Sequence, residues 1–144
     1  MTNSRVCVDS SLVIKLAIDE ESSDEARERW SEWRRNDTEV VAPSLLSYEV
    51  TSALRNKVHR GLVLLDEAVD ALAELLRLPI SVISVPDIHE RAWRLSTMFG
   101  RPNAYDAYYL AVAEIVDCPL WTADRRLANA VKGFTPGIHV VGQP

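Results

Sequence analysis

The sequence predicts an α/β protein built around a mostly parallel sheet. Short apolar runs alternate along the 144 residues with segments in which apolar side chains recur at helical spacing. This alternation is typical of β–α–β units, in which a helix carries the chain back so that the next strand runs parallel. No repeat, low-complexity segment or linker divides the chain, so we expect one domain over residues 1–144.

Five apolar runs are strand candidates, because each is short, apolar and bounded by polar or turn-forming residues. The run ISVISV, for example, lies between Pro79 and Pro86. The five candidates are Arg5–Val8, Val40–Ala42, Ile80–Val85, Leu120–Thr122 and Ile138–Val141.

Seven segments between these runs are helix candidates. Ala26, Trp30 and Trp33 follow an i, i+4, i+7 spacing, which predicts either a seam packed on the core or an apolar face for a partner. Gly61 follows two basic residues and marks the end of another helix. The candidates are Ser11–Ile18, Asp24–Arg35, Ser44–Arg60, Leu65–Leu76, Asp87–Phe99, Ala104–Val116 and Arg125–Val131.

Composition and charge argue against several classes of protein. No run approaches the roughly 18 apolar residues of a membrane span, and Arg5, Asp9 and Lys15 break the apolar stretch that a signal peptide would need. The two cysteines lack the spacing of a zinc site, so a reduced, cytoplasmic setting is expected. The formal net charge of −5 offers no cationic field to a polyanion. A nucleic-acid substrate would therefore need bound cations or local arginines.

Two acids directly follow predicted strands. Asp9 comes after VCV and Asp124 after PLWTA, and ligand sites in parallel α/β sheets gather beyond the carboxyl ends of the strands. Each acid also precedes a predicted helix, where Asp is a favoured N-cap. A site role and a capping role are both open for these residues.

Glu49 lies on the apolar face of a predicted helix, between Leu46 and Ala53. A carboxylate that faces a core is costly unless it is paired or bound to a metal. The alternatives to a functional role are a buried cationic partner, such as Arg55 or Lys57, and an apolar stripe that turns away at this point.

Asp106 belongs to the segment NAYDAYYLAVAEIV, which is apolar nearly all round and is therefore expected to be a central helix. If Asn103 is the N-cap, Asp106 is the third helical residue and gains from the helix dipole. It would also project close to the ends of neighbouring strands. We expect all four acids to meet at one edge of the sheet.

Such a cluster needs cations. Two carboxylates about 5 Å apart repel by roughly 3 kcal/mol at an effective dielectric constant near 20, so four together must either raise a pKa or bind metal. Oxygen ligands with no nearby His or Cys favour Mg²⁺ or Mn²⁺ over zinc. Such ions accept phosphate oxygens as further ligands, which would let an acidic protein bind a polyanion.

Four stretches, VCVDSS, PSLLSYEVTSAL, NAYDAYYLAVAE and LWTADRRL, together resemble the PIN domain family and, more narrowly, the VapC-type toxins of bacterial toxin–antitoxin pairs. Their order and spacing match across most of the chain. The resemblance implies a three-layer α/β/α fold around a mostly parallel sheet of four or five strands. It also implies a Mg²⁺- or Mn²⁺-dependent endoribonuclease that cuts single-stranded regions of RNA, such as tRNA or rRNA, and leaves a 3′-hydroxyl and a 5′-phosphate. A cognate antitoxin and a homodimer are the implied partners.

The resemblance assigns the catalytic acids to Asp9, Glu49, Asp106 and Asp124. Asp9 and Asp106 would be the main metal ligands, and Asp124 would complete the cluster directly or through water. Glu49 would hold the attacking water or help to deprotonate it.

Four further residues are weaker candidates. Ser10 and Thr122 would position phosphate or water by hydrogen bonding, although Thr122 is equally explained as a strand residue satisfied by the backbone. Arg125 and Arg126 would contact RNA, although a solvated charged face is the alternative.

Two other functional classes compete with a nuclease. A phosphoacceptor aspartate enzyme would need an acidic pair or an Asp-x-Asp near the first strand, and VDSS provides neither. A non-catalytic interaction module of the same fold would use its acids mainly as helix caps. Glu49 argues against that second class, because its position is not a cap.

Overall fold

The computed structural model describes residues 4–142 and contains one parallel sheet. Its strands are β1 (Arg5–Val8), β2 (Glu39–Ala42), β3 (Ser81–Val82), β4 (Leu120–Thr122) and β5 (Ile138–Val140). They lie in the order β3-β2-β1-β4-β5, and every neighbouring pair is parallel. The first strand of the chain is therefore central, and the sheet grows outward from it in both directions.

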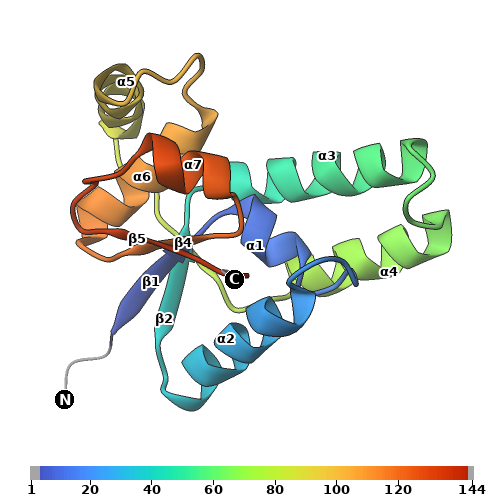
Figure 1. Ribbon diagram of the computed structural model, residues 1–144. Coiled ribbons are helices and arrows are strands. Elements are labelled where there is room, and N and C mark those ends of the chain that lie inside the picture. The colour runs from blue at the N-terminus through green and yellow to red at the C-terminus, as the bar shows by residue number, and fades with distance from the viewer. Residues whose placement is uncertain (1–3, 143–144) are drawn as a thin grey trace.

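Helices cover both faces of the sheet, which confirms the predicted three-layer α/β/α class (Figure 1). Helices α5, α6 and α7 lie on one side, and α1 to α4 lie on the other, with α3 and α4 forming a hairpin that reaches away from the sheet. Their bounds are α1 (Ser10–Ile14), α2 (Ser23–Arg35), α3 (Leu45–His59), α4 (Leu65–Leu76), α5 (Ile88–Met98), α6 (Tyr105–Val116) and α7 (Arg125–Ala130).

The alternation of side chains along the strands creates two cores. In β1, Val6 and Val8 pack with α1 to α4, whereas Cys7 between them packs with α5 to α7. Val40 and Val41 of β2 divide in the same way. This is the alternation of side chains expected of a strand that is buried on both faces. It fixes which layer of helices each side chain faces, up to the carboxyl ends of the strands.

Helix α6 is the most deeply buried helix, as its apolar sequence predicts. Residues Ala107 and Tyr109 to Ala113 are all buried beneath β1 and β4. The Ala26, Trp30 and Trp33 stripe of α2 likewise packs on the core, with Trp33 meeting Trp121 edge-on at 5.6 Å between ring centroids.

Two elements are shorter than predicted. The strand expected over Ile80–Val85 covers only Ser81–Val82, because it is an edge strand whose single neighbour, β2, ends at Ala42 before Pro43. One further bond, from the Ile83 amide to the Ala42 carbonyl, ends the pairing. The helix expected over Ser11–Ile18 ends at Ile14 and continues as tight turns.

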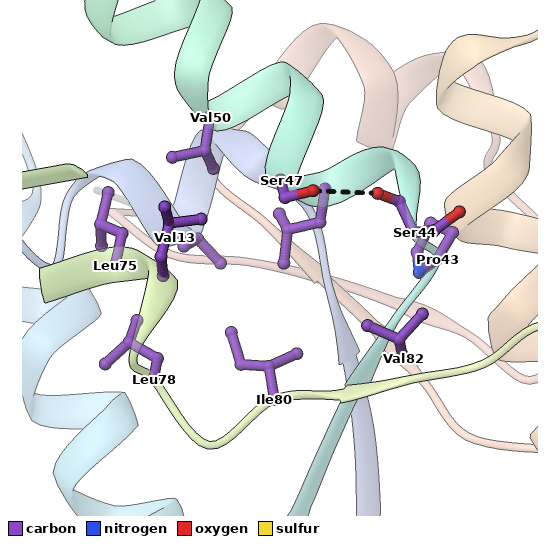
Figure 2. A pocket seen from close by; sticks show the side chains of 11 residues that line it. Val13, Pro43, Ser44, Ser47, Val50, Leu75, Leu78, Ile80 and Val82 are labelled. Atoms are coloured by element: carbon purple, nitrogen blue, oxygen red, sulfur yellow. Dashed lines mark hydrogen bonds between the residues drawn. The ribbon is translucent and has the colours of Figure 1, made fainter. Parts of the chain in front are cut away.

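An apolar cavity of about 110 Å³ lies between α3, the end of α4 and β3 (Figure 2). Val13, Val50, Leu75 and Ile80 face it, and no ionisable side chain of the described range lines it. A cavity of this chemistry holds no reacting group, so the candidate site lies elsewhere. In the part of the chain that the structure covers, no helix is both long and apolar enough to cross a membrane.

Candidate active site at the carboxyl edge of the sheet

Asp9 stands where β1 ends and α1 begins, and its side chain is almost fully buried, at 5 % exposed. The carboxylate accepts hydrogen bonds from Ser11 Oγ at 2.7 Å, from the Leu12 amide at 3.2 Å and from Thr122 Oγ1 at 2.5 Å. The bond from Leu12 is the N-cap that the sequence allowed. The other two bonds come from hydroxyl groups aimed at a buried carboxylate, which a cap alone does not require.

Asp124 occupies the equivalent position after β4. Its Oδ1 accepts hydrogen bonds from the Arg126 amide at 2.9 Å and the Leu127 amide at 3.2 Å, so it also caps a helix. Its own amide donates to Thr122 Oγ1 at 3.0 Å. Thr122, which is fully buried, therefore connects the backbone of Asp124 to the carboxylate of Asp9.

Glu49 lies one turn into α3 and is half-buried. Its Oε1 accepts hydrogen bonds from the hydroxyl of Tyr109 at 2.5 Å and from Ser10 Oγ at 3.4 Å. Lys57, the cation considered as its alternative partner, instead bonds Glu20 at 2.7 Å. The inward direction predicted for Glu49 is thus observed, and its partners in the described range are hydroxyl groups rather than a cation.

Asp106 lies in the first turn of α6, which begins at Tyr105 with Ala104 as the N-cap. The predicted cap residue, Asn103, accepts a hydrogen bond from the Tyr105 amide at 3.2 Å. The Asp106 carboxylate is half-buried and forms an ion pair with Arg101 at 3.2 Å. Asp106 is therefore the second residue of the helix rather than the third, and the guanidinium of Arg101 already faces its carboxylate.

Asp9, Glu49 and Asp106 converge at one rim although they come from three separate elements. Ser10, next to Asp9, contacts Glu49 directly. Tyr109 contacts Glu49 and lies one turn after Asp106 on the same helix. Within residues 4–142, Asp124 is connected to this group through its backbone amide and Thr122 rather than through its carboxylate, so it stands at the edge of the cluster.

The electrostatics of the rim are dominated by the burial of Asp9. Burial raises the pKa of Asp9 to about 6, although the bonds from Ser11, Thr122 and the Leu12 amide oppose the rise, and the nearby Asp106 carboxylate adds to it. Burial also raises the pKa of Tyr109, and the hydrogen bond to Glu49 adds to the effect. The Tyr109 hydroxyl therefore remains a proton donor to Glu49 at every ordinary pH.

The donor chemistry of the rim fits a hard divalent cation. The groups that converge are carboxylate and hydroxyl oxygens, which Mg²⁺ and Mn²⁺ prefer. Within residues 4–142, however, no three His, Cys, Asp or Glu side chains stand in an arrangement ready to hold a metal ion. Asp9 is turned to its hydroxyl donors and Asp106 to Arg101, so the oxygens are gathered but not closed around an ion.

Arg125 and Arg126 are exposed and line a hollow of about 350 Å³ beside Asp124, together with Lys15. Arg125 donates to the carbonyl of Gly142. Lys15 donates to Glu20 at 2.9 Å and to the Glu21 carbonyl at 2.6 Å. The two arginines therefore border the rim, and their candidacy for RNA contact stays a prediction.

Three residues at the rim were not among the sequence candidates. Tyr109 could have been found, because it lies three residues after Asp106 and so shares its helical face. Ser11 could have been found as the second residue after a capping Asp, where a hydroxyl reaches the carboxylate. Arg101 gives no sequence signal, because it lies in an irregular loop before α6.

Fold and site together define a class of protein: a three-layer α/β/α domain that gathers carboxylates beyond the carboxyl ends of parallel strands. Comparison with known proteins identifies the family. The model of the family described as PIN domain matches residues 6–133. The chain belongs to the PIN domain family and, within it, to the VapC group.

The curated relatives carry VapC names. Ribonuclease VapC3 of Pyrobaculum aerophilum is 33% identical over 127 residues, which cover 87% of this chain and 93% of the relative. Ribonuclease VapC9 of Mycobacterium tuberculosis is 33% identical over 94 residues, covering 65% of this chain and 72% of the relative.

Two solved structures share the fold. The crystal structure of PAE2754 from Pyrobaculum aerophilum superimposes with a TM-score of 0.66 at 27% identity, covering 92% of this chain and 90% of that one. Mycobacterium tuberculosis VapC20, described as a toxin that cleaves the sarcin-ricin loop, also gives a TM-score of 0.66, at 20% identity over 90% of this chain and 96% of that one. The second similarity supports the fold alone.

Proposed function

We propose that this protein is an endoribonuclease toxin of a toxin–antitoxin pair, which hydrolyses phosphodiester bonds in single-stranded regions of RNA with the help of Mg²⁺ or Mn²⁺. One observation carries the proposal: a nearly fully buried carboxylate, Asp9, meets Glu49 and Asp106 at the rim where ligand sites of parallel sheets form. The names of the relatives, Ribonuclease VapC3 and Ribonuclease VapC9, support the activity.

Each rim residue has a role in this proposal. Asp9 and Asp106, with Asp124 at the edge, would hold the cation, which supplies positive charge for a scissile phosphate and its attacking water. Binding of the metal cation by Asp106 would compete with the ion pair between Asp106 and Arg101. Arg101 would then be released toward the substrate, where a guanidinium favours phosphate.

Glu49 would accept a proton from the attacking water. Tyr109 and Ser10 both donate to Oε1, so they hold the carboxylate in one orientation and leave Oε2 for the water. A base held in this way is positioned before the substrate arrives, which lowers the cost of reaching the reactive geometry. Thr122 and Ser11 would keep Asp9 directed to the rim.

A second candidate is a PIN-like interaction module that does not catalyse. It is favoured by the capping bonds of Asp9 and Asp124 and by the ion pair of Asp106, each of which gives an acid a structural use. It does not explain why Glu49 and Tyr109 meet at the same rim. We keep it as the outcome expected if no RNA is cut.

The proposal is tested by incubating the purified protein with total tRNA and rRNA in Mg²⁺, in Mn²⁺ and in EDTA. We expect discrete fragments with 5′-phosphate ends that require metal and are absent with Asp106→Asn. Arg34→Ala is a matched surface control, because Arg34 is exposed on α2 away from the rim. Equal fragments from Asp106→Asn would show that the cleavage does not come from the proposed acidic site.

A cognate antitoxin and a homodimer are part of the same proposal, because the resemblance to VapC toxins implies both. Sedimentation of the purified chain measures the second of these. A single species of monomer mass across micromolar concentrations would contradict the homodimer.

A further inference from the structure

A second hollow, of about 440 Å³, lies between the start of α3, the segment after β3, and the starts of α5 and α6, and its lining combines aromatic side chains with aliphatic and proline side chains. Its aromatic residues are Tyr48 of α3, His89 of α5, and Tyr105 and Tyr108 of α6, and we refer to it as the aromatic hollow. Its size lies within the range of roughly 300–1,000 Å³ that is usual for small-ligand sites. None of the functional roles assigned above uses these four side chains.

The aromatic hollow shares its two main walls with the acidic rim. On α3, Tyr48 precedes Glu49, and on α6, Tyr105 precedes Asp106. Helical spacing separates the two faces: Tyr105 and Tyr108 are one turn apart and line the hollow, whereas Asp106 and Tyr109 are one turn apart on the next face. If a phosphate of an RNA strand lies at the rim, the neighbouring nucleotide of that strand therefore lies beside the hollow.

The chemistry of the lining selects a neutral, planar ligand. No Lys, Arg, Asp or Glu within residues 4–142 lines the hollow, so it offers no charge to a phosphate group. Tyr48 and Tyr105 are 72% and 57% exposed, which leaves their ring faces free for stacking. Base stacking on aromatic side chains is the usual way in which proteins hold single-stranded RNA.

The hollow also has a fixed polar edge. The hydroxyl of Tyr108 bonds Nδ1 of His89 at 2.6 Å, and the two rings meet edge-on with centroids 5.4 Å apart. Ser44 and Ser84 add hydroxyl groups to the same lining. Polar groups of this kind can pair with the edge of a base that stacks on the tyrosines.

We infer that the aromatic hollow binds an unpaired nucleobase adjacent to the scissile phosphate of the RNA substrate. The inference rests on the proposed function and deepens it, because it assigns the preference for single-stranded RNA to a surface of this chain. A base in a duplex is stacked and paired, so it is not available to the tyrosines, whereas a base in a loop is.

The inference is tested by comparing two RNA strands of eight nucleotides: oligoadenylate, and a strand with the same ribose-phosphate backbone but no bases. Binding is measured by fluorescence anisotropy in Mn²⁺, in a Glu49→Gln background that prevents cleavage under the proposed mechanism. Because the strands carry nearly the same charge, their difference in Kd isolates the contribution of the bases. We expect the Glu49→Gln protein to bind oligoadenylate at least tenfold more tightly than it binds the strand without bases.

The double substitution Tyr48→Ala/Tyr105→Ala is expected to weaken oligoadenylate binding about tenfold and to leave binding of the abasic strand unchanged. The conservative double substitution to Phe keeps the stacking faces and should keep the preference. Trp93→Ala is the matched aromatic control, because Trp93 is 74% exposed on α5 and does not line the hollow. In the cleavage assay of the protein with Glu49 intact, the Ala double variant should raise KM about tenfold and leave kcat nearly unchanged.

Two results would overturn the inference. One is a preference for oligoadenylate that survives the Ala double substitution. The other is that the Ala double substitution lowers the affinity for both strands equally and also changes the protein from dimer to monomer in sedimentation. That result would make the hollow a contact between two copies of the chain. A base preference without any cleavage would instead reject the proposed hydrolysis and support the hollow as an RNA-binding surface. Absence of binding to either strand would reject both.

Discussion

At the scale of single residues, Asp9 caps a helix and also lies in the candidate site. Its carboxylate caps α1 through the Leu12 amide while two hydroxyl groups hold it toward the rim. Burial nevertheless raises its pKa to about 6. The folded protein therefore carries an unfavourable buried charge at neutral pH, which a bound cation would relieve.

Asp9→Asn is expected to stabilise the metal-free protein, and to do so more at pH 8 than at pH 5. The pKa of Asp9 rises from 3.8 to about 6 on folding, so the native state binds the proton more tightly than the unfolded chain. The resulting stability is complete below about pH 4 and is lost as the pH rises through 6. The gain in free energy of unfolding should be about 1 kcal/mol larger at pH 8 than at pH 5.

Urea denaturation in EDTA at the two pH values measures this difference. Ser96→Ala is the control, because it removes a buried hydroxyl on α5 that bonds the Trp93 carbonyl and is not part of the rim. If Asp9→Asn were equally destabilising at both pH values, the charge on Asp9 would not be the source of instability.

At the scale of elements, the site depends on α3 and α6, which approach the rim from the two sides of the sheet. The bond from Tyr109 of α6 to Glu49 of α3 joins them across the carboxyl end of the strands. Tyr109 is 1 % exposed and packs in the core, so the position of its hydroxyl is fixed by the fold. The orientation of Glu49 is therefore determined by an element 60 residues away in the sequence.

Tyr109→Phe is expected to lower kcat for RNA cleavage about tenfold or more, with little change in KM. The substitution keeps the ring in the core and removes only the donor that holds Glu49, which costs about 1–3 kcal/mol for a bond to a charged group. Single-turnover cleavage and thermal melting, measured together, separate the site role from a structural one. An equal loss of kcat in Ser96→Ala at a similar melting temperature would show that lowered stability alone causes the effect.

The elements themselves were predictable, because strand and helix periodicities along this chain agree with where the side chains are buried. The five strand candidates and seven helix candidates all form, and only their ends differ. The inward position of Glu49 could be predicted because a helical face can be read from spacing, whereas its role in a site stays a prediction. The ends of β3 and α1 could not be predicted, because pairing with β2 and the tight turns after Ile14 are set by contacts that spacing does not encode.

The partners within the site were less predictable than its acids. The sequence placed Asp9 and Asp124 at strand ends, but only the tertiary structure shows that Thr122 connects them. Arg101 faces Asp106 from a loop of no regular structure, so neither periodicity nor a capping pattern indicates it. Side chains that act on an acid from another element are the part of a site that sequence patterns reveal least.

At the scale of the whole molecule, an acidic protein with a net charge of −5 must bind a polyanion without a global attractive field. Under the proposed function, three parts of the surface would share this task. The rim offers carboxylates for a cation, the hollow beside Asp124 carries Arg125 and Arg126, and the aromatic hollow offers uncharged ring faces. RNA binding is then expected to depend on divalent cations more than on the charge of the protein.

Mn²⁺ is expected to raise the melting temperature of the unchanged protein, because an ion that binds only the native state stabilises it by mass action. At one hundred times its Kd the gain is about 2.7 kcal/mol. The shift should be absent or much reduced in Asp9→Asn and Asp106→Asn, and unchanged in Arg34→Ala. Equal shifts in all four proteins, measured by differential scanning fluorimetry, would place the ion outside the rim.

The decisive measurement is single-turnover RNA cleavage by Glu49→Gln, Asp106→Asn and the double variant, compared with the unchanged protein. If the acids act as one site, removing the second acid costs little once the first is gone, so the double variant should cleave no more than a few times more slowly than the weaker single variant. Losses that multiply in the double variant would show that Glu49 and Asp106 act independently, and would contradict a single acidic site at the carboxyl edge of the sheet.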